Sequence, residues 1–129
     1  MADDPPQDDP TILDDDRLFR RVRPNQLIPE SDGSQRPSSA VFKTPELSVN
    51  IESLMVQQGR PPEDTHTRYP GEYLTSITAR MVRAYNHPIV KATEPPNDPA
   101  HGLVLGKKKE SFANAMMRQH QWIVPPPKK

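Results

Sequence analysis

Residues 97–106 read NDPAHGLVLG, and they place a turn, a histidine and a short apolar run within ten residues. Asn and Asp side chains bond to nearby backbone groups and proline presets φ, so residues 96–99 predict a turn. The apolar run predicts a short buried strand over residues 102–105. Residues 89–93 predict another strand. The interval between the two is too short for a helical crossover, so we expect them to pair as an antiparallel hairpin.

Two strands are predicted upstream of this hairpin. Residues 17–23 carry Leu18, Phe19 and Val22 on a cationic background, and Pro24 ends the segment because the residue before a proline prefers an extended conformation. Residues 47–51, LSVNI, alternate apolar and polar side chains, which is typical of a half-buried strand. Residues 38–42 are predicted to enter a further short strand after a proline-rich loop.

Two main helices are predicted. In residues 73–85 the apolar side chains fall on one helical face, with Asn86 suited to a left-handed C-terminal residue and Pro88 preventing continuation. The second helix covers residues 112–122, with Ser111 as its N-cap. A shorter helix is predicted within residues 51–58. Residues 60–71 predict a loop, and its length favours a functional role.

These segments predict a small α+β domain with a mostly antiparallel sheet, covering residues 17–124. Only 33% of the 129 residues are hydrophobic and seventeen are proline, so we expect a small core. Residues 1–16 are rich in Asp and Pro and predict a disordered acidic tail. Residues 125–129, PPPKK, predict a stiff, basic, proline-rich tail.

The zero net charge conceals an uneven distribution. Residues 1–16 hold seven acids and no base, whereas residues 17–129 hold all seventeen Lys and Arg with the other ten acids, which gives formal charges of −7 and +7. Such a basic body predicts attraction to a polyanion through counterion release. The candidate polyanion-binding residues are Arg17, Arg20, Arg21, Arg23, Lys107, Lys108, Lys109 and Arg118. The alternative is a solvated surface balanced by the acidic tail.

Several functional classes are not predicted. The chain has no cysteine, so disulfides and thiolate metal sites are excluded, and its four histidines have no close metal-ligand spacing. We expect neither a metal nor a cofactor. The N-terminus lacks the pattern of a secretory signal and no apolar run is long enough to span a bilayer. A cytoplasmic protein without membrane contact is the resulting expectation.

Candidate catalytic residues are His101, Arg21, Ser38 and Ser39. A histidine at a strand start can act as a general acid or base, although the favoured alternative is that its ring bonds a carbonyl of the turn. An Arg on a first strand with two Ser on a later one can hold a dinucleotide for ribosyl transfer. This set is similar, in residue types alone, to that of ADP-ribosyltransferases, and no motif places a catalytic glutamate.

Three functional hypotheses follow. The first is a small non-enzymatic accessory protein that binds another macromolecule, with a protein as the expected partner. The second is nucleic-acid binding by the basic body, with the acidic tail as competitor. The third is a small transferase or nuclease-like enzyme centred on His101.

Overall fold

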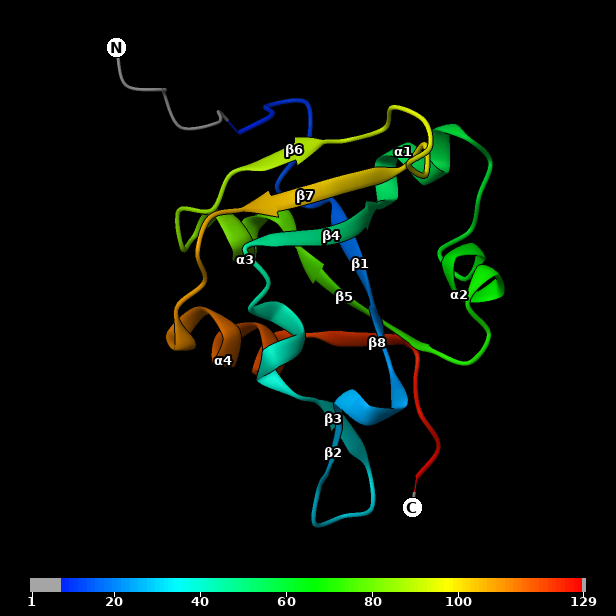
Figure 1. Cartoon of the computed structure of the whole chain (residues 1–129), viewed down its shortest axis with the longest axis vertical. Helices are drawn as coiled ribbons and strands as arrows, with labels where there is room; N and C mark the ends of the chain where they lie inside the picture. The colour runs from blue at the N-terminus through cyan, green and yellow to red at the C-terminus, as the bar shows by residue number, and fades with distance from the viewer. Residues whose placement is uncertain (1–7, 129) are drawn as a thin grey trace.

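Six antiparallel strands form the main sheet of the computed structural model, which describes residues 8–128 (Figure 1). The order across the sheet is β6-β7-β4-β1-β5-β8, so the first strand is central and the last is at an edge. The strands are β1 (Arg17–Val22), β4 (Glu46–Ile51), β5 (Tyr73–Thr78), β6 (Ile89–Lys91), β7 (His101–Leu105) and β8 (Gln121–Val124). The predicted α+β class with an antiparallel sheet is confirmed.

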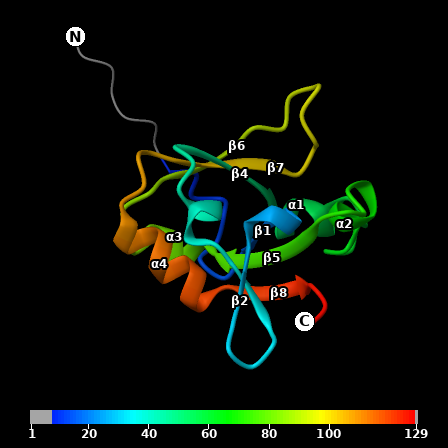
Figure 2. The same ribbon diagram turned by 60° about the horizontal axis from the view of Figure 1, so that its bottom comes forward.

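Four α-helices and a small hairpin surround the sheet within the described residues. The helices are α1 (Glu52–Gln57), α2 (Asp64–Arg68), α3 (Ala79–Arg83) and α4 (Glu110–Gln119). Figure 1 places α1 and α2 toward one end of the sheet and α3 and α4 toward the other. The hairpin of β2 (Leu27–Pro29) and β3 (Gln35–Pro37), preceded by the 3-10 turn η1 (Pro24–Gln26), projects away from the sheet (Figure 2).

Buried side chains cover both faces of the sheet. Alternation along β1 sends Leu18 into the main core cluster and Phe19 into a second cluster on the opposite face. The main cluster includes Phe112 and Met116 of α4, whereas the second includes Met55 of α1. The face that carries Phe19 also carries the polar side chains described in the next section.

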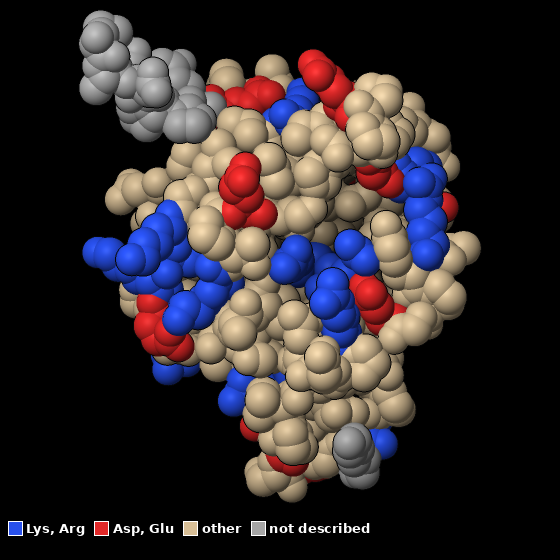
Figure 3. Space-filling view, viewed as in Figure 1, with Lys and Arg blue, Asp and Glu red and all other residues tan. Residues whose placement is uncertain are grey.

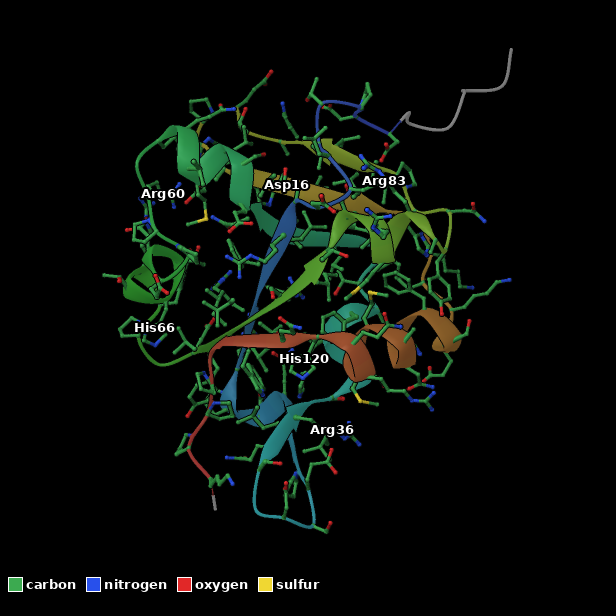
Figure 4. All side chains as sticks on the ribbon, turned by 180° about the vertical axis from the view of Figure 1, so that it is seen from behind. Asp16, Arg36, Arg60, His66, Arg83 and His120 are labelled. Carbon is green, nitrogen blue, oxygen red and sulfur yellow. The ribbon has the colours of Figure 1, made fainter. Side chains whose placement is uncertain are left out.

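The N-terminal segment belongs to the folded structure from residue 8 onward. Ile12 is completely buried, and Arg83 of α3 pairs with Asp8 at 2.9 Å and with Asp14 at 2.8 Å. Figure 4 shows Arg83 directed toward this segment. The expected disorder is therefore wrong for residues 8–16, because an apolar anchor and ion pairs fix the segment. Residues 1–7 lie outside the described residues.

Several predicted elements are confirmed. Strands β1, β4, β6 and β7 lie where the sequence predicts them, and β6 pairs with β7 as an antiparallel hairpin. Helix α1 falls within the predicted residues 51–58. Asn86 has the expected positive φ, 64°. Beyond β8, the Gln35 side-chain amide donates to the carbonyl oxygen of Pro127 at 2.7 Å, which ties the end of the chain to β3.

Other predictions are wrong. Residues 73–85 form strand β5 followed by the short helix α3, with the Thr78 hydroxyl accepting from the Met81 N–H at the junction. Residues 39–42 form the 3-10 turn η2 (Ser39–Phe42) instead of a strand. Helix α4 starts at Glu110 with Lys109 as N-cap, and ends before β8. The predicted loop of residues 60–71 contains α2.

Candidate functional site

A polar cavity of about 260 Å³ opens on one face of the sheet. Its floor is formed by strands β1, β4 and β7, and its walls by α2 and the connection that precedes β7. Asn50 of β4 lies directly opposite Phe19 of β1 on one side and His101 of β7 on the other. Ser48 lies two residues from Asn50 on the same face. Strand register therefore gathers these side chains in one place.

His101 makes a hydrogen bond through each ring nitrogen. Its Nδ1 lies 3.0 Å from the carbonyl oxygen of Ala92, and its Nε2 lies 2.6 Å from the hydroxyl oxygen of Ser48. A carbonyl can only accept, so Nδ1 carries the proton and Nε2 is the acceptor for the Ser48 hydroxyl. The imidazole is thereby fixed in the tautomer that presents a basic nitrogen to a serine hydroxyl.

The backbone at Ser48 is held from the other face of the sheet. Arg20 points away from the cavity floor and donates to the carbonyl oxygen of Ser48 at 3.1 Å and to that of Val41 at 3.3 Å. Burial lowers the pKa of the Arg20 guanidinium to about 10, which leaves it charged at neutral pH. Arg20 is consequently a positioning residue for β4.

Arg21 faces the cavity beside an aromatic ring. Its guanidinium carbon lies 3.7 Å from the centre of the Tyr69 ring, a cation–π contact, and it donates to Glu72 at 3.1 Å. These two contacts orient the planar guanidinium against one wall. Its remaining N–H groups, with the Asn50 amide, are hydrogen-bond donors available to a ligand in the cavity.

A cluster of ion pairs holds the remaining walls together. Arg60 donates to both carboxylate oxygens of Asp98, at 2.8 and 2.9 Å, and also to Asp64 of α2 at 2.7 Å. The Asp98 carboxylate also accepts from the Ala100 N–H at 2.7 Å. These bonds keep the pKa of Asp98 below its ordinary value against the opposing effect of burial. Arg60 lies in the connection between α1 and α2 (Figure 4).

The structure brings two of the four candidate catalytic residues together. His101 and Arg21 both line the cavity. Ser38 and Ser39 belong to the region of η2, which packs against α4, and neither lines the cavity; the Ser38 hydroxyl accepts from the Ala40 N–H. The serine beside His101 is Ser48, where Ser38 or Ser39 was expected. The sequence feature that could have indicated Ser48 is its polar position in the alternating strand LSVNI.

The candidate polyanion-binding residues have different surroundings. Arg17 pairs with Glu52, and Arg23 lies 4.0 Å from the Glu72 carboxylate. Lys108 is buried, and its ammonium nitrogen lies 2.6–3.1 Å from four carbonyl oxygens, which share its three N–H groups. Burial lowers the pKa of Lys108 to about 8. The exposed members are Arg23, Lys107, Lys109 and Arg118.

Basic atoms on the face drawn in Figure 3 form separate groups, at the left, the centre and the right. The acidic residues 8–16 pair with other bases: Asp15 with Arg80 at 3.2 Å, and Asp8 and Asp14 with Arg83. These ion pairs tie the described part of the acidic segment to α3, and none of them involves a candidate polyanion-binding residue.

Among residues 8–128, no three His, Cys, Asp or Glu side chains are grouped so as to hold a metal ion. The same residues include no helix with the length and apolar character of a membrane span. No protein-family model matches the chain, and comparison with curated proteins and with solved structures found no significant match.

Proposed function

We propose that the chain is a small enzyme that transfers or hydrolyses an acyl or phosphoryl group, with Ser48 as nucleophile and His101 as general base. The proposal rests on one observation: the Ser48 hydroxyl lies 2.6 Å from Nε2 of a histidine whose other nitrogen is bonded to a carbonyl. A nucleophile, a base in contact with it and a group that orients the base are the arrangement needed for covalent catalysis.

In this reaction Oγ of Ser48 attacks the acyl or phosphoryl centre and forms the new bond while its proton moves to Nε2 of His101. The leaving group departs with the electron pair of its own bond and takes that proton. Water then attacks the intermediate and gives a proton to Nε2 of His101, which passes it to Oγ of Ser48 as the bond between Ser48 and the intermediate breaks. The Asn50 amide and the Arg21 guanidinium line the same cavity and are donors for the negative charge that develops on the attacked group.

A fluorophosphonate probe tests this proposal, because it reacts with serines activated by a base. The Ser48 Oγ–P bond forms, the P–F bond breaks, fluoride leaves and the hydroxyl proton goes to His101. We expect intact mass and peptide mapping to place the phosphonyl group on Ser48. Ser48→Ala should abolish labelling, and His101→Gln should slow it by about 10²-fold or more.

Ser39→Ala is the matched control, since Ser39 does not line the cavity, and it should label like the wild type. Circular dichroism and thermal unfolding establish that each variant is folded. Absence of labelling at Ser48 in the wild type, or equal rates in His101→Gln and the wild type, would refute the enzymatic proposal.

A second candidate function, binding of a protein partner, is favoured by an apolar groove of about 550 Å³. The side chains of Leu13 and Val56, 69% and 67% exposed, line it beside Asp15. An apolar segment with flanking basic residues matches this surface. Leu13→Asp with Val56→Asp should abolish capture of such a partner by the tagged chain, whereas Ser48→Ala should leave capture unchanged.

A further inference from the structure

We infer that the substrate of the His101 cavity carries a carboxylate or phosphate group and that Arg68 binds this anion. The inference rests on the enzymatic proposal, because only that proposal makes the molecule bound in the cavity a substrate. It identifies Arg68, at the end of α2, as a specificity-determining residue.

Arg68 is held loosely for an arginine between two carboxylates. Its side chain is 51% exposed, and its contacts are long: 3.4 Å to Asp64 and 3.3 Å to Asp98. Charge-assisted N–H···O bonds are usually about 2.7–2.9 Å. Arg68 lines the cavity, and its guanidinium makes only these long contacts with the two acids.

Both carboxylates are already satisfied by Arg60. That side chain is only 12% exposed and bonds Asp98 through two nitrogens and Asp64 through the third, all at 2.7–2.9 Å. Arg68 can therefore turn toward a ligand without leaving an unpaired acid behind, which would otherwise oppose the movement. Arg60 therefore fixes Asp64 and Asp98 in the cavity walls. Arg68 can give up its long contacts with these acids and bind an anion in their place.

The other cavity residues fit the same ligand. Arg21 lies against Tyr69 and adds a second positive charge, while Asn50 offers a neutral donor. The cavity volume of about 260 Å³ lies below the roughly 300–1,000 Å³ of pockets for drug-sized ligands. The cavity thus accommodates a small anionic group and the few atoms next to it, and a whole dinucleotide exceeds it.

Equilibrium binding to the Ser48→Ala variant tests this inference without any covalent step. Three probes are titrated: acetate, its neutral isostere acetamide, and inorganic phosphate. Binding is followed through the NMR signals of the Arg68 Nε–H and the His101 ring. We expect at least one anion to bind and acetamide to bind at least tenfold more weakly. The anion that binds more tightly identifies the group as carboxylate or phosphate.

Arg68→Gln in the Ser48→Ala background should weaken anion binding by about tenfold or more, and Arg68→Lys should restore part of it because the charge is kept. For these variants the His101 ring reports binding. Arg80→Gln is the control, since Arg80 is exposed on α3 and does not line the cavity. Binding of neither anion, acetamide binding as tightly as the better of the two anions, or an Arg68→Gln variant that binds that anion like its parent would overturn the inference. Fluorophosphonate labelling is scored separately in the wild type, so the enzymatic proposal and the anion preference can fail independently.

Discussion

The Asp16 carboxylate accepts two hydrogen bonds from Ser53, one from its backbone N–H at 2.8 Å and one from its hydroxyl at 2.5 Å. Ser53 is the second residue of α1, whose first-turn N–H groups have no partner within the helix. Asp16 thus caps α1, the helix that contributes Met55 to the second core cluster. The negative charge of Asp16 also interacts favourably with the positive N-terminal end of the helix dipole.

Asp16→Ala should lower the free energy of unfolding by about 1.5–3 kcal/mol, because it removes bonds to a charged acceptor and leaves the half-buried donors of Ser53 unpaired. Urea unfolding followed by Trp122 fluorescence measures this change. Asp15→Ala is the matched control: its partner Arg80 is 69% exposed, and exposed pairs contribute about 0–1 kcal/mol. Equal effects of the two substitutions would contradict the capping role.

Lys108→Met should destabilise the protein by about 1–3 kcal/mol. The methionine retains much of the apolar stem, but the four carbonyl oxygens that accept from the ammonium lose their donor. Thermal or urea unfolding checks the value. The neighbouring Lys107 is exposed, so Lys107→Met should change stability by no more than about 0.5 kcal/mol.

Gly102→Ala should cost about 1–3 kcal/mol through overpacking. A Cβ at this position would lie 2.5 Å from Cδ1 of Ile51 and 3.1 Å from the Val90 carbonyl oxygen. Because Gly102 follows His101, labelling of Ser48 should slow as well. Gly71, with open space around it, provides the control, and Gly71→Ala should leave both stability and labelling near their wild-type values.

His120 should make stability depend on pH. Burial lowers its pKa below the ordinary 6.5, so as pH falls through 6.5 the unfolded chain binds a proton that the folded chain does not. The stability contribution is complete above pH 6.5 and decreases as pH falls toward the folded pKa, by less than about 1.4 kcal/mol per pH unit. Urea unfolding at pH 7.5, 6.5 and 5.5 measures this slope.

The ring centres of Trp122 and His120 lie 4.9 Å apart, so Trp122 fluorescence also reports the protonation of His120. His120→Gln should flatten the slope in part. A remainder is expected from His87, whose pKa burial also lowers. An unchanged slope in His120→Gln would show that His120 is not the responsible group.

Local patterns predicted the strands that surround His101 but not the segments whose structure depends on distant contacts. Strand β5 is buried on both faces, so Leu74 and Ile77 give no alternation, and their spacing imitates a helix. Ile12 is the only fully buried apolar residue among residues 8–16, and its anchoring requires Arg83, some seventy residues away. Neither the burial of β5 on both faces nor the contact between Arg83 and Ile12 can be predicted from the residues next to them in the sequence.

The candidate site was predictable only in part, because part of it also depends on contacts between distant segments. His101 and Arg21 stood out by residue type and position, whereas Ser48 resembled a solvent-facing residue of a half-buried strand. It faces a cavity because α2 covers that face, and α2 lies in a segment whose prolines predict a loop. The length of that segment was the remaining sequence signal for a functional role.

Strand order has a kinetic consequence. Of the neighbouring pairs in the main sheet, only β6 and β7 are consecutive strands in the chain. Strand β1 pairs with β4 and β5, and β4 pairs with β7, so these pairings join segments that other strands separate in the sequence. Joining segments far apart in sequence loses loop entropy before any contact compensates for it, which slows folding relative to a domain built from local contacts. The His101 and Ser48 side chains come from two such strands, so the site is assembled only when the non-local sheet forms.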